Sequence, residues 1–420
     1  MKPEAAPDLR IAYLVSRFPE YSEGFIRYEL REVGRRVGKL VVLPLVAAPI
    51  QGAADLLDEA GLTGDQVERP PGLFSPAVVG AVLRSFVCNP PGFLRAAAAV
   101  CSACLSSPRH GLKWLLLFPR MLWLGGRAAG RRTDHIHAHF AALPANAAWT
   151  IHQVFGIPYS VTAHAYDLHT SPRILRRTLA DASFGVTVSE HTARLARRLV
   201  PESPDFCWHV IRNGVPLDLF PLPQPRRLQA RPQILAVGRL LPQKGFADLL
   251  EACRILRDEG REFSCLIVGD GPLALDLRRQ ATTAGLTDIV TFAGVITGEE
   301  LRRVYAAADL FVLPCVTPPG GGGDTLPVVL TEAAARGLPL VSTPVAAIAE
   351  FIEDGHSGRL VPEHDPAALA GALRDVLGDE TLRRELAANA RRTVEVSYDA
   401  VASAARLVSL FAHSLKAVSR

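Results

Sequence analysis

Residues 234–245 read ILAVGRLLPQKG, and residues 246–259 continue as FADLLEACRILRDE. The opening apolar run is typical of a buried strand, and a loop with two glycines and two basic residues follows it. The continuation places apolar residues at helical spacing. A strand, a loop and a helix in this order form the repeating unit of a parallel α/β sheet.

The same unit recurs on both sides of this stretch. Before it, IAYLVS at 11–16 and LVVLPLV at 40–46 are predicted strands, and after it SCLIV at 264–268 is another. A proline-rich stretch at 216–232 has the composition of a linker. The pattern therefore predicts two Rossmann-like domains that face each other across a cleft, at 1–214 and 233–395, joined by a linker at 215–232. Ligands of such sheets bind beyond the carboxyl ends of the strands.

Composition excludes several protein classes. The 420 residues are 49% hydrophobic and 21% charged, which excludes a disordered or fibrous chain. Seven cysteines are too few for a disulfide scaffold. The first ten residues carry Glu4 and Asp8 before any apolar run, which is not the pattern of a signal peptide. No uninterrupted apolar stretch reaches the length of a spanning helix. We therefore expect a cytoplasmic protein.

Positive charge gathers in one segment. Residues 69–133 contain nine Lys or Arg and no Asp or Glu, although the net charge of the whole chain is only +4. The same segment is rich in Trp, Phe and Leu, and we expect a basic, apolar helical insert at about 70–132. It either lies on an anionic membrane surface or forms a plain helical pair whose arginines extend to solvent. No recognisable motif accompanies the charge, so nucleic acid is not an expected partner.

Two motifs in the second half could bind a nucleotide diphosphate. After the predicted strand, Gly238 permits close approach of a ligand, and Arg239 and Lys244 supply positive charge for phosphate oxygens. A helix is expected over 326–336, capped by Thr325, with amides that suit an anion. Asp324 and Glu332 could accept hydrogen bonds from sugar hydroxyls. The simpler alternatives are an exposed basic loop and a helix with one capping and one solvated acid.

The remaining candidates are single residues. His164 directly follows a predicted strand, and Asp167 could orient it or serve as a turn acid. His135, His137 and His139 alternate on a strand and should face one way. With no nearby carboxylate recognised, the pattern does not favour a metal site. Gly269 lies in a GDGP turn, which is a weak signal on its own.

In combination and in order, these segments resemble the retaining glycosyltransferases of family 4, which have the GT-B fold, and within them the exopolysaccharide and colanic-acid type. The resemblance covers most of the chain outside about 48–132. It is carried by YLVSRFPEYSEGF at 13–25, VTAHAYD at 161–167, VIRNGV at 210–215, ILAVGRLLPQKG at 234–245, LIVGDGP at 266–272 and LPVVLTEAAARGLPLVST at 326–343.

The resemblance implies metal-independent transfer of a sugar, of the hexosyltransferase type, from a nucleotide diphosphate sugar to a hydroxyl acceptor. It implies no cofactor, a final helix at 396–420 that returns to the N-terminal domain, and an acceptor that is lipid-linked or a polysaccharide precursor, on the inner face of the membrane. The catalytic positions that it implies are His164, Asp324, Arg239 and Lys244. The donor-binding positions are Gly24, Gly238, Arg239, Lys244, Gly269, Asp324, Leu326, Pro327, Val328 and Glu332.

Three residues depart from the family pattern. Asp324 stands where Glu is usual, Thr325 where Gly is usual, and Gly24 where this subgroup often has Thr. These departures leave other functions open. The alternatives are transfer to a soluble natural-product acceptor, a nucleotide-sugar 2-epimerase, and an inactive partner that only binds sugar nucleotides.

Overall fold

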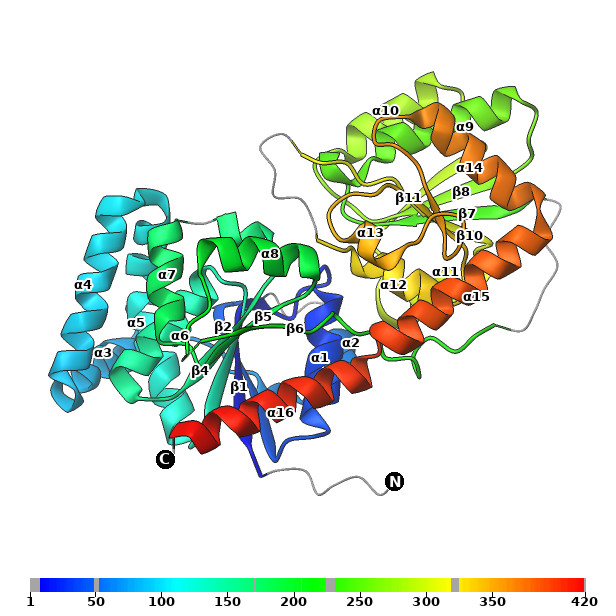
Figure 1. Cartoon of the computed structure of the whole chain (residues 1–420). Coiled ribbons are helices and arrows are strands. Elements are labelled where there is room, and N and C mark those ends of the chain that lie inside the picture. Colours follow the sequence, from blue (N-terminus) through cyan, green and yellow to red (C-terminus); the bar gives the residue numbers. More distant parts are fainter. Residues whose placement is uncertain are drawn as a thin grey trace. The chain divides into compact units, whose positions relative to one another are not determined.

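Two compact units make up the chain in the computed structural model, which describes residues 8–48, 53–169, 171–204, 206–223, 231–318 and 325–418 (Figure 1). The N-terminal unit comprises Met1–Arg212 and Val401–Arg420, and the C-terminal unit comprises Asn213–Ala400. The expected linker, 215–232, groups with the C-terminal unit. The last helix, α16 (Ala400–Val418), begins at the border of the two units and belongs to the N-terminal one along nearly all of its length.

The N-terminal unit is built on a six-stranded parallel sheet with strand order β2-β1-β3-β4-β5-β6. Its strands are β1 (Arg10–Phe18), β2 (Lys39–Ala47), β3 (His135–His139), β4 (Tyr159–Ala163), β5 (Phe184–Thr187) and β6 (Trp208–Val210). All residues of β3 and β4 are buried, as in a parallel sheet covered on both faces. The parallel α/β class predicted from the alternating pattern is confirmed.

Each face of this sheet packs against its own set of helices. One core contains Trp114, Trp149 and Leu175, contributed by α5 (Pro108–Gly130), α6 (Leu143–Phe155) and α7 (Pro172–Ala180). The other contains Leu30 and Phe411, contributed by α1 (Gly24–Gly34) and α16. The remaining helices of the unit are α2 (Ala53–Glu59), α3 (Pro76–Cys88), α4 (Pro90–Ser106) and α8 (Glu190–Leu199).

The C-terminal unit has a second six-stranded parallel sheet, with strand order β12-β11-β10-β7-β8-β9. Its strands are β7 (Gln233–Val237), β8 (Ser264–Val268), β9 (Val290–Gly294), β10 (Leu310–Leu313), β11 (Leu340–Ser342) and β12 (Arg359–Leu360). Its helices are α9 (Phe246–Asp258), α10 (Ala274–Thr283), α11 (Gly298–Ala307), α12 (Val328–Ala335), α13 (Ile348–Phe351), α14 (Pro366–Gly378) and α15 (Glu380–Ser397). Strand β7 lies between β10 and β8. The loop that follows its carboxyl end therefore lies beside the loops that follow those two strands.

Helix α12 starts later than the sequence predicted. The expected helix covered 326–336 with Thr325 as its cap, whereas the observed N-cap is Pro327, which is extended at ψ 123°. Thr325 is buried, and its carbonyl accepts the backbone N–H of Ala347. Tertiary contacts at Thr325 therefore replace the capping role that its side-chain type suggested.

Candidate functional site

The loop after β7 carries the two basic residues that the sequence singled out. Arg239 is exposed, whereas Lys244 is only 8% exposed at the end of a short 3-10 turn, Pro242–Lys244. A Cβ placed on Gly238 would lie 3.8 Å from Cδ and Cε of Lys244, so the lysine stem covers this glycine. Gly245 ends the turn at φ +68°, and a Cβ there would lie 1.7 Å from the carbonyl oxygen of Pro314. Only glycine allows this close approach.

Gly269 joins the loop after β8 to the loop after β7. Its φ is +135°, and a Cβ would lie 2.0 Å from the carbonyl oxygen of Gly238. The backbone N–H of Leu240 donates to the Asp270 carbonyl at 3.0 Å, so the two loops are hydrogen-bonded to each other. Both predicted glycines thus lie together at the carboxyl edge of the sheet, where ligands of such sheets bind.

Glu332 on α12 is a buried carboxylate with a defined partner. It is 4% exposed, and the Tyr305 hydroxyl of α11 donates to its Oε2 at 2.8 Å. The alternative of a solvated surface Glu is therefore wrong. A buried carboxylate is costly unless hydrogen bonds hold it, and the tyrosine provides one of them. Tyr305 was not recognised from the sequence.

The start of α12 is the segment with the predicted amides. Pro327 is buried, whereas Leu326 and Val328 are half-buried. Asp324, the predicted first acid, lies outside the residues that the structure describes. Before that gap, Glu363 holds the chain after β10: its Oε2 accepts the Thr317 backbone N–H at 2.5 Å, and its Oε1 accepts the Thr317 hydroxyl at 3.0 Å.

In the N-terminal unit, His164 directly follows β4, as predicted. Asp167 is bonded to backbone: its Oδ1 accepts the His164 backbone N–H at 2.7 Å, and its Oδ2 accepts the Ala141 N–H at 2.5 Å. Asp167 is therefore a turn acid, one of the two predicted alternatives. Burial raises the pKa of its carboxyl to about 6, against the opposing effect of these N–H groups.

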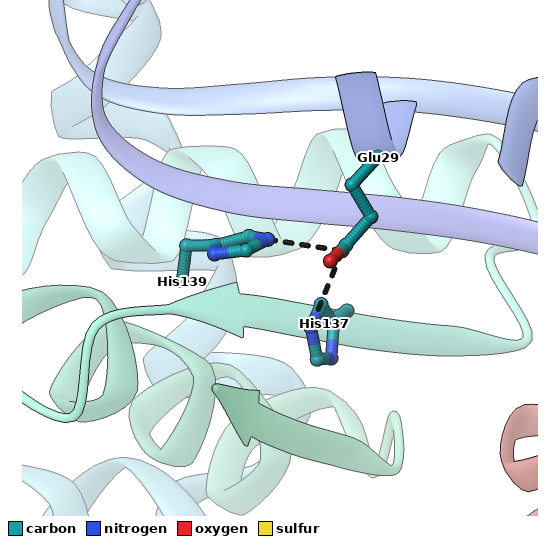
Figure 2. Close-up of side chains that lie close together, drawn as sticks. All are labelled: Glu29, His137 and His139. Atoms are coloured by element: carbon teal, nitrogen blue, oxygen red, sulfur yellow. Dashed lines mark hydrogen bonds and ion pairs between the residues drawn. The ribbon is translucent and has the colours of Figure 1, made fainter. Parts of the chain in front are cut away.

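The His164 ring belongs to a chain of hydrogen bonds that begins at Glu29 of α1. Its Nε2 lies 3.2 Å from Nδ1 of His139. Nε2 of His139 lies 3.0 Å from Oε1 of Glu29, the contact drawn in Figure 2. Tyr13 donates to the same oxygen at 2.7 Å. Burial raises the pKa of Glu29, but His139 and these hydrogen bonds outweigh that effect and lower it overall. Burial lowers the pKa of His164 well below its ordinary value.

The three alternating histidines of β3 face one way, as predicted, but the expectation that no carboxylate lies near them is wrong. Figure 2 shows Glu29 beside His137 and His139, with ligand atoms within 4.8 Å of one another. These atoms already have partners inside the protein. Nε2 of His137 lies 2.9 Å from the Thr162 hydroxyl, and Nδ1 lies 2.8 Å from the Ser160 hydroxyl. The arrangement is that of a satisfied polar network.

Gly24 is the first residue of α1 and is buried. The loop before it is held by Arg27, which pairs with Glu59 at 2.6 Å and donates to the backbone carbonyls of Glu20 and Tyr21. Burial raises the pKa of Glu23, the N-cap residue, to about 7. A partly protonated acid thus stands at the start of this helix.

A family comparison covers most of the C-terminal unit. Residues 223–393 match the model of the glycosyl transferases group 1. Over these residues the C-terminal unit is similar to the group 1 glycosyltransferases. The inferred resemblance is confirmed at the level of the group 1 glycosyltransferases over this range, and the residues from Gly238 to Glu332 lie inside it.

Three curated relatives align with about half of the chain or less. The amylovoran biosynthesis glycosyltransferase AmsK of Erwinia amylovora is 37% identical over 46% of this chain and 47% of its own length. The putative colanic acid glycosyltransferase WcaL of Escherichia coli is 40% identical over 39% of this chain and 40% of its own. A GDP-mannose-dependent phosphatidylinositol monomannoside mannosyltransferase of Mycolicibacterium smegmatis is 34% identical over 49% and 56%. The chain thus spans about half the length of these relatives.

Solved structures show that the fold extends over the whole chain. HepE of Anabaena, crystallised with UDP and glucose, aligns with a TM-score of 0.69 at 16% identity, over 96% of this chain and 100% of its own. Sucrose-phosphate synthase of Thermosynechococcus elongatus has a TM-score of 0.69 at 20% identity, over 97% and 100%. The GT-B class, with its two Rossmann-like units, is confirmed.

Proposed function

We propose that the chain is a retaining glycosyltransferase of family 4, which moves a sugar from a nucleotide diphosphate sugar to a hydroxyl acceptor without a metal or another cofactor. The observation that carries the proposal is the group 1 match over a unit with Arg239 and Lys244 in the loop after β7 and a buried Glu332 on α12. Basic side chains next to glycine backbone suit a diphosphate.

Each residue has a role that fits its place. Arg239 and Lys244 neutralise the charge that grows on the departing diphosphate, which is the task that a divalent cation performs in other enzymes. Glu332, oriented by Tyr305, accepts hydrogen bonds from the ribose. For Asp324 and His164 the roles come from the family resemblance alone, which assigns the donor-sugar hydroxyls to Asp324 and a position near that sugar to His164.

The proposed acceptor is a lipid-linked or polysaccharide precursor, met at the inner face of the cell membrane. Two observations support it. The relatives AmsK and WcaL are named for amylovoran and colanic acid biosynthesis, and the mycolicibacterial relative for a phosphatidylinositol monomannoside. The N-terminal unit also carries a basic insert without acidic residues, which suits an anionic acceptor.

A thermal-shift screen with UDP, GDP, ADP and dTDP tests the donor site. A nucleotide at about 100 times its dissociation constant stabilises the folded protein by about 2.7 kcal/mol. We expect one of the four to raise the Tm of the wild type, and Arg239→Ala and Glu332→Gln to reduce that shift. Arg261→Ala is the control, because Arg261 is an exposed arginine of the same unit outside this edge. If none of the four nucleotides raised the Tm, the result would contradict the proposed donor site.

Transfer itself is tested with the sugar nucleotides of the base so identified. Product formation in the presence of EDTA would support metal independence, and the anomeric coupling constant of the product reports retention. Loss of transfer in EDTA that added Mg²⁺ restores would contradict the metal-free mechanism.

A further inference from the structure

Exposed apolar side chains gather on one helical layer of the N-terminal unit. Of the 17 large apolar side chains that are exposed among the described residues, ten lie between Phe74 and Leu116. Phe74 is 93% exposed and Leu105 is 88% exposed. Exposed apolar side chains that gather on one part of a surface mark an interaction site. We call the exposed side chains of residues 74–116 the 74–116 surface.

The exposed side chains follow helical stripes. Leu83 and Val87 are four residues apart on α3, and Leu94 and Leu105 are eleven residues, or three turns, apart on α4. Figure 1 shows α3, α4 and α5 as one group at one side of the N-terminal unit. The stripes therefore belong to one helical layer.

These side chains differ from those that hold the insert to the protein. The buried side of α4 presents small residues such as Ala96 and Ala103 to the core, and α5 contributes Trp114 and Met121 to the same core. Trp114 is fully buried and donates to the Thr150 hydroxyl of α6. The insert is thus a packed part of the unit that is apolar on both sides, so internal packing alone does not explain its sequence.

The basic residues of the insert fall into two groups, those that bond to the rest of the unit and those that are exposed. Arg120 donates to backbone carbonyls, and Arg127 and Arg131 both pair with Glu68. These three arginines hold the insert to the unit. The other six basic residues of the segment are exposed, namely Arg69, Arg84, Arg95, Arg109, Lys113 and Arg132. No acidic residue of the segment opposes them.

Among the described residues, no single helix is long and apolar enough to cross a bilayer. The pair α3 and α4 passes that test together, but it is bent by 118°. Because α4 buries one side in the protein core, the bent pair has only its other side available to lipid.

We propose that the 74–116 surface docks on an anionic lipid bilayer, with its leucines and phenylalanines in the interface and its exposed basic residues at the headgroups. Apolar side chains mixed with Lys and Arg, and no acid, are complementary to anionic headgroups. They are not complementary to a second copy, because two such surfaces would bring like charges together. The proposal goes beyond sugar transfer and does not depend on it.

Co-sedimentation of the full-length protein with vesicles tests the surface. We expect binding to vesicles of phosphatidylcholine with 30% phosphatidylglycerol, in roughly the anionic range that attracts basic segments, and weaker binding to phosphatidylcholine alone or at high salt. The variant Leu83→Ser/Val87→Ser/Leu105→Ser should bind at least about tenfold more weakly than the wild type. The matched control Leu275→Ser/Val396→Ser changes residues of the C-terminal unit that are 76% and 73% exposed, and should bind as the wild type does.

A charge variant separates the two parts of the interaction. Arg84→Glu/Lys113→Glu should lose the preference for anionic vesicles, whereas Arg198→Glu, at an exposed arginine of α8, should retain it. The nucleotide-induced Tm shift should be unchanged in every variant, which distinguishes lost docking from a lost donor site or a misfolded chain. Equal vesicle binding by the triple serine variant would overturn the proposal. So would absent vesicle binding combined with a dimer in sedimentation equilibrium that the same variant abolishes.

Discussion

The Tyr305 hydroxyl donates a 2.8 Å hydrogen bond to Oε2 of Glu332, and both side chains are buried in the C-terminal unit. The tyrosine comes from α11 and the glutamate from α12, two helices whose order in the chain gives no hint of the contact. The bond fixes a carboxylate that would otherwise be an unfavourable buried charge. It therefore connects the stability of the unit with the proposed ribose contact.

Tyr305→Phe removes only that hydroxyl. We expect a loss of about 1–3 kcal/mol in unfolding free energy, because a buried charged acceptor loses a donor. Nucleotide affinity should also fall several-fold as the carboxylate loses its orientation. Urea unfolding and nucleotide titration measure the two effects. Unchanged affinity together with the expected stability loss would show that Glu332 does not contact the nucleotide.

Glu29→Gln tests the chain of hydrogen bonds to His164. The Glu29 carboxylate accepts from Nε2–H of His139, so in a neutral His139 the Nδ1 atom is an acceptor for Nε2–H of His164. An amide at position 29 can donate instead, and would favour the opposite tautomers. We expect altered imidazole ¹⁵N shifts for both histidines and a fall in kcat of about tenfold or more with little change in donor KM.

The Glu29→Gln variant also tests whether Glu29 has only a structural role. If Glu29 serves stability alone, the Tm will fall while the ¹⁵N shifts of His164 and kcat remain those of the wild type. Glu29→Asp keeps the charge and should retain the wild-type tautomers if the shorter side chain reaches His139.

His135 should make the N-terminal unit less stable in acid. Burial lowers its folded pKa from 6.5 to about 3, so the unfolded chain takes up a proton below pH 6.5 that the folded chain does not. This contribution to stability is present above pH 6.5 and is lost as the pH falls toward 3. The loss amounts to about 1.4 kcal/mol between pH 7.5 and 5.5.

His135→Phe removes that titration and keeps a ring against Phe184 and Phe411. The difference in unfolding free energy between pH 7.5 and 5.5 should therefore shift by about 1.4 kcal/mol relative to the wild type, toward greater relative stability in acid. Urea unfolding at the two pH values measures it. An identical pH dependence in both proteins would show that His135 binds a proton as readily in the folded state as in the unfolded state.

Gly245→Ala and Gly260→Ala form a matched pair. Their φ angles are +68° and +74°, so an alanine pays a similar backbone strain of about 1–2 kcal/mol at either position. At Gly260 a Cβ meets nothing within 4 Å, whereas at Gly245 it would lie 1.7 Å from the Pro314 carbonyl oxygen. We expect Gly245→Ala to lose at least about 2 kcal/mol more, and to weaken nucleotide binding. Equal losses of unfolding free energy in the two variants would show that the loop after β7 can shift away from the Pro314 carbonyl oxygen.

Local pattern was sufficient for the strands and for several site positions. Apolar runs such as 234–238 predict buried strands because a parallel sheet covered on both faces needs continuous apolar residues. His164, Arg239 and Gly269 follow strands in the chain, and so they had to lie at the carboxyl edges of the sheets. The start of α12 was predicted incorrectly, because the buried surroundings of Thr325 outweighed its capping propensity.

Contacts between residues that are distant in the chain could not be predicted from local pattern. Glu29 is 110 residues from His139, and sequence spacing gave no reason to pair them. One hint was present, since Glu29 shares the helix face of Ile26 and Val33, which are buried. An acid on an apolar helix face requires a buried partner.

By itself, the sequence determined the two α/β units, the glycine and basic residues of the loop after β7, and an insert that is both basic and apolar. These properties depend on neighbouring residues and on strand order, which the chain encodes locally. Only the tertiary structure decided that Tyr305 holds Glu332, that Glu29 reaches His164 through His139, and which leucines of the insert face solvent. Those properties depend on which side of each helix the rest of the protein covers, and that is settled only when distant segments pack together.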